Sequence, residues 1–369
     1  MEKANINALQ LFFLMLLFEL GSAILVPLAT GAKQDAWIAI LLGMFTSFIL
    51  LLVYNKLYLY YPNLLPTEYM QKIMGKVTGK LFAFMYILYF IYAAARVLRD
   101  FGEMLLTFAY PETPLFIANA LLLMVVIYLV SKGIEVMGRS AQLLFFLMYV
   151  LAISGFILVI CSGLIHFKNL QPTLEEGLLP VLKVVFTESL YFPFGESIVF
   201  IMILPYLNNP KKAKMTMLCA NGLTGINLAI VMIINISVSG VGLTERSYFP
   251  LLTTIQSIQV AGFLERLDVY FMIALVVGGF FKIGLFFYAA VVGTANLFKI
   301  KSPSQLPYYL GILTLFYSII LSRNFMEHLY EGIIIDPFFL QIPLFIVIPF
   351  LLLTVAFLKN RKRENEYKV

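Results

Sequence analysis

Ionisable side chains interrupt one of the most apolar stretches of the sequence, 89-YFIYAAARVLRDFGE-103. Charges inside a membrane helix are costly and usually face the protein interior, where they pair with one another or serve a ligand. On a helix, a spacing of four residues would pair Arg99 with Glu103 and Arg96 with Asp100. We therefore expect these four residues to form structural or coupling ion pairs.

Tyr89 and Ala93 precede these charges on the same predicted helix and lie closer to its middle. Tyr89 shares a face with Arg96 and Arg99 through spacings of three and four residues. We expect Tyr89 and the small Ala93 to shape a ligand cavity. Packing or anchoring at the membrane interface is the alternative for any tyrosine, because the chain has 21 of them.

A lone lysine, Lys282, lies near the middle of another apolar stretch, 269-VYFMIALVVGGFFKIGLFFYAAVVG-293. A lysine at that depth needs an anion, a cage of carbonyl groups or loss of its proton. Lys282 could replace a bound cation or face the carboxylate of a ligand. It could equally form a buried pair with Glu196 or Glu188 that only holds helices together. Phe286 lies one turn away on the same face.

Two further carboxylates stand beside residues that interrupt helices, in 17-LFELGSAILVP-27 and 190-LYFPFGESIVF-200. Pro193 removes a backbone donor, and Gly21 and Gly195 are conformationally permissive. The ends of half-helices present free N–H and C=O groups that can hold a charged ligand. The alternative is ordinary packing, since Gly and Pro are frequent in membrane helices.

The expected ligand-binding residues come from these four stretches. They are Leu20, Gly21, Ser22, Ala23, Tyr89, Ala93, Pro193, Phe194, Gly195, Glu196, Lys282 and Phe286. We expect the backbone at 20–23 and 194–196 to hold the charged ends of the ligand. Glu188, half a helix before the second interruption, is expected to be structural.

The composition places these stretches in a membrane. Of the 369 residues, 61% are hydrophobic and 12% are charged, against about 45–50% and 25% in soluble domains. Two cysteines and two histidines with no ligand spacing argue against a metal site, and we expect no cofactor. No catalytic motif is present, so we expect no enzyme activity.

Ten stretches approach the length of about 20 apolar residues that a membrane helix needs. They are 7–30, 36–55, 81–109, 114–131, 141–164, 181–206, 216–240, 268–297, 305–322 and 339–358. The interrupted stretches are the first and the sixth, which is typical of two inverted repeats of five helices. We predict an all-α integral membrane protein with a single domain, 1–369, and with repeats at about 7–164 and 181–358.

The basic residues indicate the orientation. Of the 26 Lys and Arg residues, three lie inside spans; with a cytoplasmic N-terminus, 17 of the others fall on the cytoplasmic side and six outside. This bias predicts that both termini are cytoplasmic. The basic tail 359–369 is expected to contact anionic lipid and not nucleic acid. Between the spans, we expect an interfacial helix at 66–76 and an ordered lid at 243–268.

The paired broken spans resemble the LeuT-type repeat of the amino acid, polyamine and organocation transporter superfamily. More specifically, the chain resembles the B subunit of the GerA-type spore germinant receptors. The similar segments are 169-NLQPTLEEGLLPVLK-183, 194-FGE-196, 208-NNPKKAK-214 and 263-FLERLDVYF-271. This resemblance implies a protein of the inner membrane of the spore that binds a nutrient germinant, commonly an amino acid. It also implies that A and C subunits are its partners.

We therefore expect a nutrient sensor that binds a small polar ligand, an amino acid, and signals to partner subunits. Two alternatives use the same features. The first is a secondary active amino acid transporter, either proton-coupled or sodium-independent. The second is a structural subunit of a channel complex, which would tolerate loss of the pocket. The sequence does not separate the three.

Overall fold

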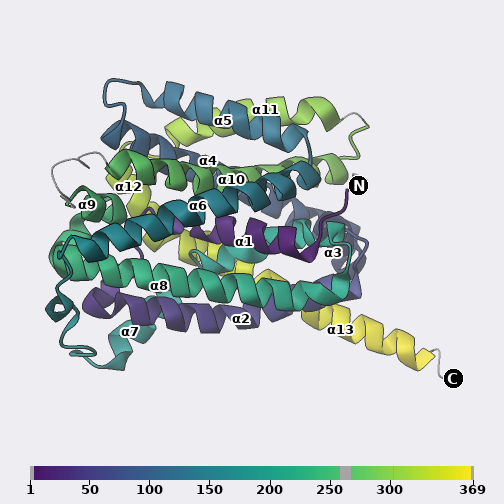
Figure 1. The fold of residues 1–369 in the computed structure, drawn as a ribbon. Coiled ribbons are helices and arrows are strands. Elements are labelled where there is room, and N and C mark those ends of the chain that lie inside the picture. Colours follow the sequence, from purple (N-terminus) through teal and green to yellow (C-terminus); the bar gives the residue numbers. More distant parts are fainter. Residues whose placement is uncertain (1–3, 258–266, 302, 367–369) are drawn as a thin grey trace.

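The computed structural model describes residues 4–257, 267–301 and 303–366. Helices make up most of this part of the chain, and within it no strand forms beyond one isolated bridge between Ile6 and Leu207. The long helices run side by side in one bundle (Figure 1). The predicted all-α class is confirmed.

Each predicted span contains a helical segment. Within the described ranges, seven segments are long and apolar enough to cross a membrane: Thr30–Tyr60, Lys76–Phe108, Ile134–Cys161, Leu178–Met202, Pro210–Arg246, Phe271–Leu297 and Pro337–Asn360. The pair Pro303–Ile320 and Phe325–Ile335 is bent by 107° and passes the same test only when its two helices are taken together as one span. The first and fourth predicted spans contain the shorter apolar helices α1 (Ala8–Ala23) and α5 (Leu115–Ser131).

The first interruption follows α1. Asn7 caps the start of this helix, where its side chain accepts a hydrogen bond from the Gln10 N–H. After Ala23 the chain turns, and the backbone N–H groups of Leu25 and Val26 both donate to the Ser22 carbonyl. A 3₁₀ segment, η1 (Thr30–Asp35), then leads into α2 (Ala36–Tyr60). The first span is therefore helical only in its N-terminal part.

The second interruption divides the sixth span. Here α7 (Leu178–Val184) passes into a π-turn, η3 (Val185–Ser189), and then into the 3₁₀ segment η4 (Phe194–Met202). The residues between η3 and η4 form a turn that contains Pro193. The helix is thus broken at the place that the proline and glycine predict.

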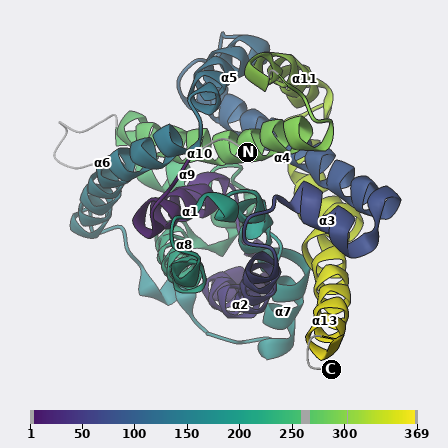
Figure 2. The same cartoon turned by 90° about the vertical axis from the view of Figure 1, so that its right-hand side faces the viewer.

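The interior of the bundle contains α1, which is apolar on all sides and buried along most of its length. It lies between α6 (Ile134–Cys161), α8 (Ala213–Arg246) and α10 (Leu267–Leu297). The view along the bundle shows α5 and α11 (Leu306–Ile320) as an outer pair over α4 (Lys76–Phe108) and α10 (Figure 2). The two interruptions therefore lie inside the protein, away from lipid.

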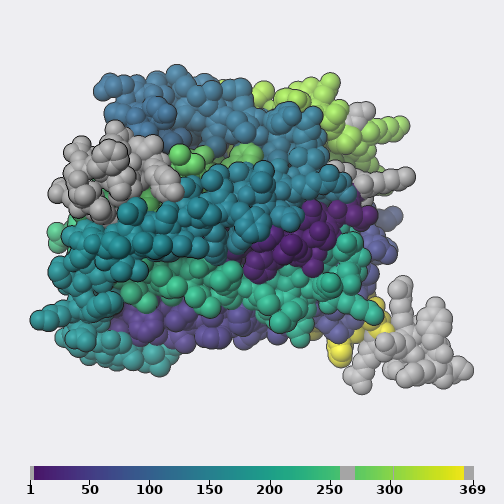
Figure 3. All heavy atoms as spheres, in the orientation of Figure 1, coloured from purple at the N-terminus to yellow at the C-terminus, as the bar shows by residue number. Residues whose placement is uncertain are grey.

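The outer surface is apolar. On α6, exposed side chains recur every three or four residues, at Leu143, Phe146, Val150, Ile153 and Ile157. Such a stripe lies on one side of a helix, and α6 and α8 cover one broad face of the molecule (Figure 3). An apolar stripe of this length on a long outer helix faces lipid, which makes the chain an integral membrane protein.

Short elements tie the ends of the bundle together. The predicted interfacial helix is α3 (Pro66–Met74). Its Thr67 donates a 2.5 Å hydrogen bond to the Asn296 side chain of α10. Of the predicted lid, α9 (Pro250–Gln256) is ordered, whereas 258–266 lie outside the described residues.

The C-terminal region begins with α12 (Phe325–Tyr330) and continues through two π-helical segments, η8 (Glu331–Ile335) and η9 (Pro337–Val347). It ends in α13 (Ile348–Glu366). This last helix extends past the bundle, and its end lies far from the other helices (Figure 1).

The predicted orientation can be tested by labelling. The Asn208 N–H donates to the Ile6 carbonyl, so Lys212, four residues further on, lies at the same end of the bundle as the N-terminus. Thr173 lies on the loop whose Leu174 N–H donates to Asp35 of η1. With the exposed Cys161 and Cys219 changed to Ser, Thr173→Cys should react with an impermeant maleimide outside intact cells, and Lys212→Cys only after lysis. Reversed labelling would contradict the cytoplasmic N-terminus.

Candidate functional site

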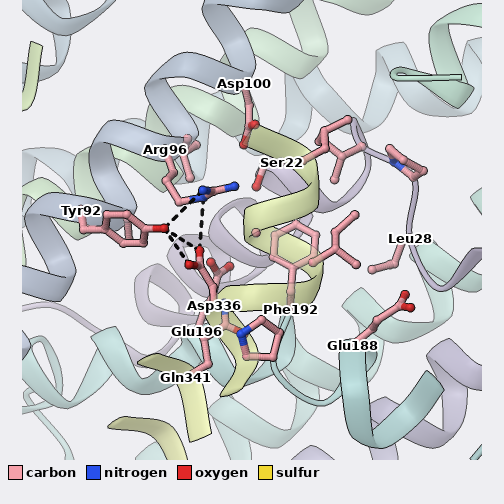
Figure 4. Close-up of a pocket in the computed structure, with 18 of the residues that line it drawn as sticks. Ser22, Leu28, Tyr92, Arg96, Asp100, Glu188, Phe192, Glu196, Asp336 and Gln341 are labelled. Carbon is pink, nitrogen blue, oxygen red and sulfur yellow. Dashed lines mark hydrogen bonds and ion pairs between the residues drawn. The ribbon is translucent and has the colours of Figure 1, made fainter. Parts of the chain in front are cut away.

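A cavity lies where the two interruptions meet α4 and the C-terminal region (Figure 4). The turn after α1 contributes Ser22 and Leu28, and the broken sixth span contributes Glu188, Phe192 and Glu196. The remaining walls come from one face of α4 and from α12 to η9, and they are described below. The cavity therefore joins elements from both predicted repeats.

Arg96 is the cation of the cavity wall on α4. Its Nε lies 3.5 Å from Asp336 Oδ2, and its Nη1 lies 3.8 Å from Glu331 Oε2. The Tyr92 hydroxyl donates to the Asp336 carboxylate and accepts from Arg96 Nη1 at 3.2 Å. A Cβ at Gly332 would collide with the guanidinium, so this glycine leaves the space that Arg96 occupies.

One of the two expected ion pairs within α4 is wrong. Arg96 does not pair with Asp100, whose Oδ1 lies 2.9 Å from Nε2 of the buried His328. The reason is that the C-terminal region brings other partners to this face: His328 of α12 contacts Asp100, and Glu331 of η8 and Asp336 contact Arg96. The other pair, Arg99 with Glu103, is present at 3.5 Å. Arg99 also donates to the Ser322 and Ile319 carbonyls.

Lys282 is fully buried and forms an ion pair with Glu196, the Nζ to Oε2 distance being 2.6 Å. Its ammonium group also lies over the rings of Phe18 and Phe192, 5.4 and 4.6 Å from their centroids. Of this pair, Glu196 lines the cavity and Lys282 does not. The sequence left several roles open for Lys282, and this geometry matches one of them, a buried ion pair with Glu196.

A second buried carboxylate, Glu19 on α1, is tied to the broken sixth span. The Ser197 hydroxyl donates to Glu19 Oε1 over 2.6 Å, and both residues are inaccessible or nearly so. Ser197 directly follows Glu196 in the chain. The broken sixth span is therefore tied to α1 through Glu19 and to α10 through Lys282.

The structure brings only some of the expected binding residues to the cavity. Ser22, Tyr89, Ala93 and Glu196 line it. Leu20 and Gly21 line a separate apolar cavity on the other side of α1, because α1 remains helical through Ala23 and turns both residues toward α6, α8 and α10. The lining of the polar cavity lacks the remaining six, which are Ala23, Pro193, Phe194, Gly195, Lys282 and Phe286.

Two of these six residues, Phe286 and Gly195, pack against aromatic side chains near the cavity. Phe286 packs against Phe18 and Tyr89, with centroids 4.9 and 6.2 Å apart. A Cβ on Gly195 would lie 2.7 Å from the ring of Phe345, so this glycine allows close packing of side chains at the break. A role for these residues in ligand binding stays a prediction.

Six polar residues of the lining were not expected as ligand contacts: Tyr92, Arg96, Asp100, Glu188, Asp336 and Gln341. Asp336 lies in 331-EGIIIDPFFL-340, just before the start of the predicted tenth span. A carboxylate within a nearly apolar run, followed by a proline, was the available signal. Because the span was counted from 339, this carboxylate was placed outside the membrane.

The fold and the polar cavity define a membrane protein of the LeuT type. Two solved structures share the fold: MhsT in complex with L-phenylalanine, with a TM-score of 0.70 and 14% identity over 96% of this chain and 88% of that chain, and Mhp1, a nucleobase-cation-symport-1 family transporter, with a TM-score of 0.63 and 13% identity over 87% and 73%. The predicted LeuT-type architecture is thereby confirmed.

A family profile described as "Spore germination protein" matches residues 5–326. Spore germination protein KB of Bacillus subtilis (strain 168) is 51% identical over 99% of this chain and 98% of its own length. Spore germination proteins YndE and A2 of the same organism are 27% and 26% identical, over 85% and 93% of this chain and 86% and 93% of theirs. The chain belongs to this spore germination protein family.

Proposed function

We propose that the chain is the nutrient-sensing membrane subunit of a spore germinant receptor. It binds a small polar nutrient, an amino acid, in the cavity between the two interruptions. The observation that supports this most strongly is the cavity itself, which joins both broken spans and is lined by charged groups of both signs, in a chain of which half the residues are identical to those of a germination protein.

The lining suits the parts of an amino acid. Arg96 offers a planar donor for a carboxylate, and carboxylates on the lining offer acceptors for an ammonium group. Val26, Leu28 and Phe192 supply apolar surface for a side chain. A neighbour of the same fold, MhsT, was solved with an amino acid, L-phenylalanine.

Binding produces a signal when the ligand prefers one conformation over another. A preference of about 100-fold, or roughly 2.7 kcal/mol, shifts a two-state equilibrium substantially. The cavity is suited to this because its walls belong to separate elements, α4, the two broken spans and the C-terminal region. A ligand that contacts all four favours the arrangement in which they are close.

The partners in this proposal are the A and C subunits of the receptor, and the location is the inner membrane of the spore with both termini in the cytoplasm. The surface available to partners is the apolar outer face together with the cytoplasmic end, where α13 extends away from the bundle (Figure 1). No nucleic acid or cofactor takes part.

Secondary transport of an amino acid is the alternative function that a specific observation favours. Mhp1, which shares the fold, is a transporter, and Lys282 with Glu196 forms a buried pair of the kind that ion-coupled carriers use. The two functions differ in whether net flux is required. A sensor needs only binding and a change of conformation.

Germination of spores that carry this receptor alone, with its partner subunits, tests the proposal. Amino acids, sugars and nucleosides are supplied one at a time, and loss of absorbance is followed. We expect a saturable response to at least one amino acid, and no response in spores that lack this chain or its partners. Unchanged germination without this chain would contradict the proposal.

A further inference from the structure

The ionisable groups that line the cavity are unequal in number. Four carboxylates, Asp100, Glu188, Glu196 and Asp336, face it together with one guanidinium, that of Arg96. A carboxylate removed from bulk water is stable only when a cation or hydrogen-bond donors compensate its charge. A carboxylate of the lining that has no such partner therefore marks a place where a ligand would have to supply the positive charge.

Three of the four are compensated by the protein. Glu196 pairs with Lys282, Asp100 contacts His328, and Asp336 is held by Arg96 and Tyr92. Over the described residues, the Glu188 carboxylate has no ion pair and accepts no hydrogen bond. A Cβ built on Gly31 would lie 3.4 Å from Glu188 Oε1. The backbone therefore passes close to this carboxylate at a glycine, which has no side chain to contact it.

The location of Glu188 suits a ligand contact. It belongs to the π-turn η3, and its carbonyl accepts hydrogen bonds from the N–H groups of Tyr191 and Phe192, which begin the turn at the break. Figure 4 shows its carboxylate on the other side of the drawn lining from Arg96, Tyr92 and Asp336, with Phe192 between them. The Glu188 carboxylate thus lies apart from the paired charges around Arg96, which Asp336 and Glu331 compensate.

We infer that Glu188 is the counter-ion of a protonated amine on the nutrient, so that the cavity selects compounds with an amine over their neutral and acidic analogues. The inference rests on the proposed function and specifies its ligand class. A positive group beside Glu188 supplies the charge that the described protein does not. A sugar or a 2-hydroxy acid would leave this carboxylate uncompensated.

The test compares each active amino acid with its 2-hydroxy acid and its N-acetyl derivative, in spores with this receptor as their only one. In the unaltered receptor, the amine compound should act at a concentration at least about 30-fold lower, the size of effect expected when one partner of a close charge pair is removed. This comparison needs no substitution and is independent of protein folding.

Glu188→Gln then identifies the residue. The amide keeps the shape and loses the charge, so the preference for the amine should fall to within a few-fold, with the protein level checked by immunoblot. Glu188→Asp should keep the preference. The matched control is Glu175→Gln, an exposed carboxylate on an outer loop, which should also keep it. A purely structural role for Glu188 would change all potencies together and leave the ratio unaltered.

The outcomes separate the inference from the proposed function. Equal potency of amine and hydroxyl compounds, activation by sugars or nucleosides alone, or an unaltered ratio in Glu188→Gln would overturn the inference and leave a nutrient sensor standing. Silence of the receptor toward every compound would overturn the proposed function, and the inference with it.

Discussion

Lys282→Met should strongly reduce the amount of folded protein. The substitution leaves the Glu196 carboxylate buried without the ammonium group that lies 2.6 Å from it. Breaking a buried ion pair from one side costs about 3–5 kcal/mol, which is a large part of the stability of a folded protein. We expect a lower level of the chain in spore membranes on immunoblots and a lower thermal midpoint of the purified protein in detergent.

The double variant Lys282→Met with Glu196→Gln is the control for this prediction. It removes both charges, and replacing a whole buried pair by neutral groups is often close to neutral for stability. The protein level should therefore recover, at least in part. A normal level of Lys282→Met combined with weakened ligand binding would contradict the structural role and would indicate that Lys282 faces the ligand.

Gly21→Leu should abolish the response to nutrient. A Cβ at this position would lie 2.9 Å from both Cβ and Cδ of Lys282 and 3.2 Å from the Gly278 carbonyl oxygen. A side chain therefore pushes α1 and α10 apart beside the pair of Lys282 and Glu196, and overpacking of this kind costs about 1–3 kcal/mol before any effect on the pair. The measurement is germination against nutrient concentration at a checked protein level.

A graded series sharpens this prediction. Gly21→Ala should weaken the response less than Gly21→Leu, because it adds one carbon to the contact. Gly242→Leu is the matched control, since nothing lies within 4 Å of a Cβ built there, and it should respond normally. A full response of Gly21→Leu would show that close approach of α1 and α10 at Gly21 is not needed.

The positions of the interruptions could be predicted from the sequence because their causes are local. Pro193 and Gly195 disturb the sixth span by their own geometry, and the structure has its turn there. The first interruption was predicted too early. Gly21 is compatible with a helix, and α1 continues to Ala23. The face that α1 turns toward α10 at Gly21 is therefore determined by how the helices pack, and the glycine alone does not predict it.

The partners of the charged residues show where prediction from one sequence fails. Arg99 and Glu103 are one helical turn apart, and their pair follows from spacing alone. Arg96 and Asp336 are 240 positions apart in the chain, and no spacing rule relates them. Their contact depends on how the bent C-terminal region packs on α4, so the local neighbour Asp100 was preferred wrongly.

Lys282 is an intermediate case. Its depth in an apolar helix predicts that it has a partner, and both Glu188 and Glu196 were candidates. The choice of Glu196 depends on the direction of the chain after the break, which the sequence does not determine. The same choice leaves Glu188 without a cation among the described residues, and this is the basis of the inferred amine site.

Uptake by the isolated chain is the measurement that tests the sensor function most directly. The purified protein is reconstituted into vesicles, and an amino acid that activates the spores is supplied in radiolabelled form, with and without proton and sodium gradients. A sensor should show saturable binding, reduced in Glu188→Gln, and no concentrative uptake under any gradient. Accumulation of the labelled amino acid against its gradient, driven by an ion, would contradict the sensor function and support a transporter.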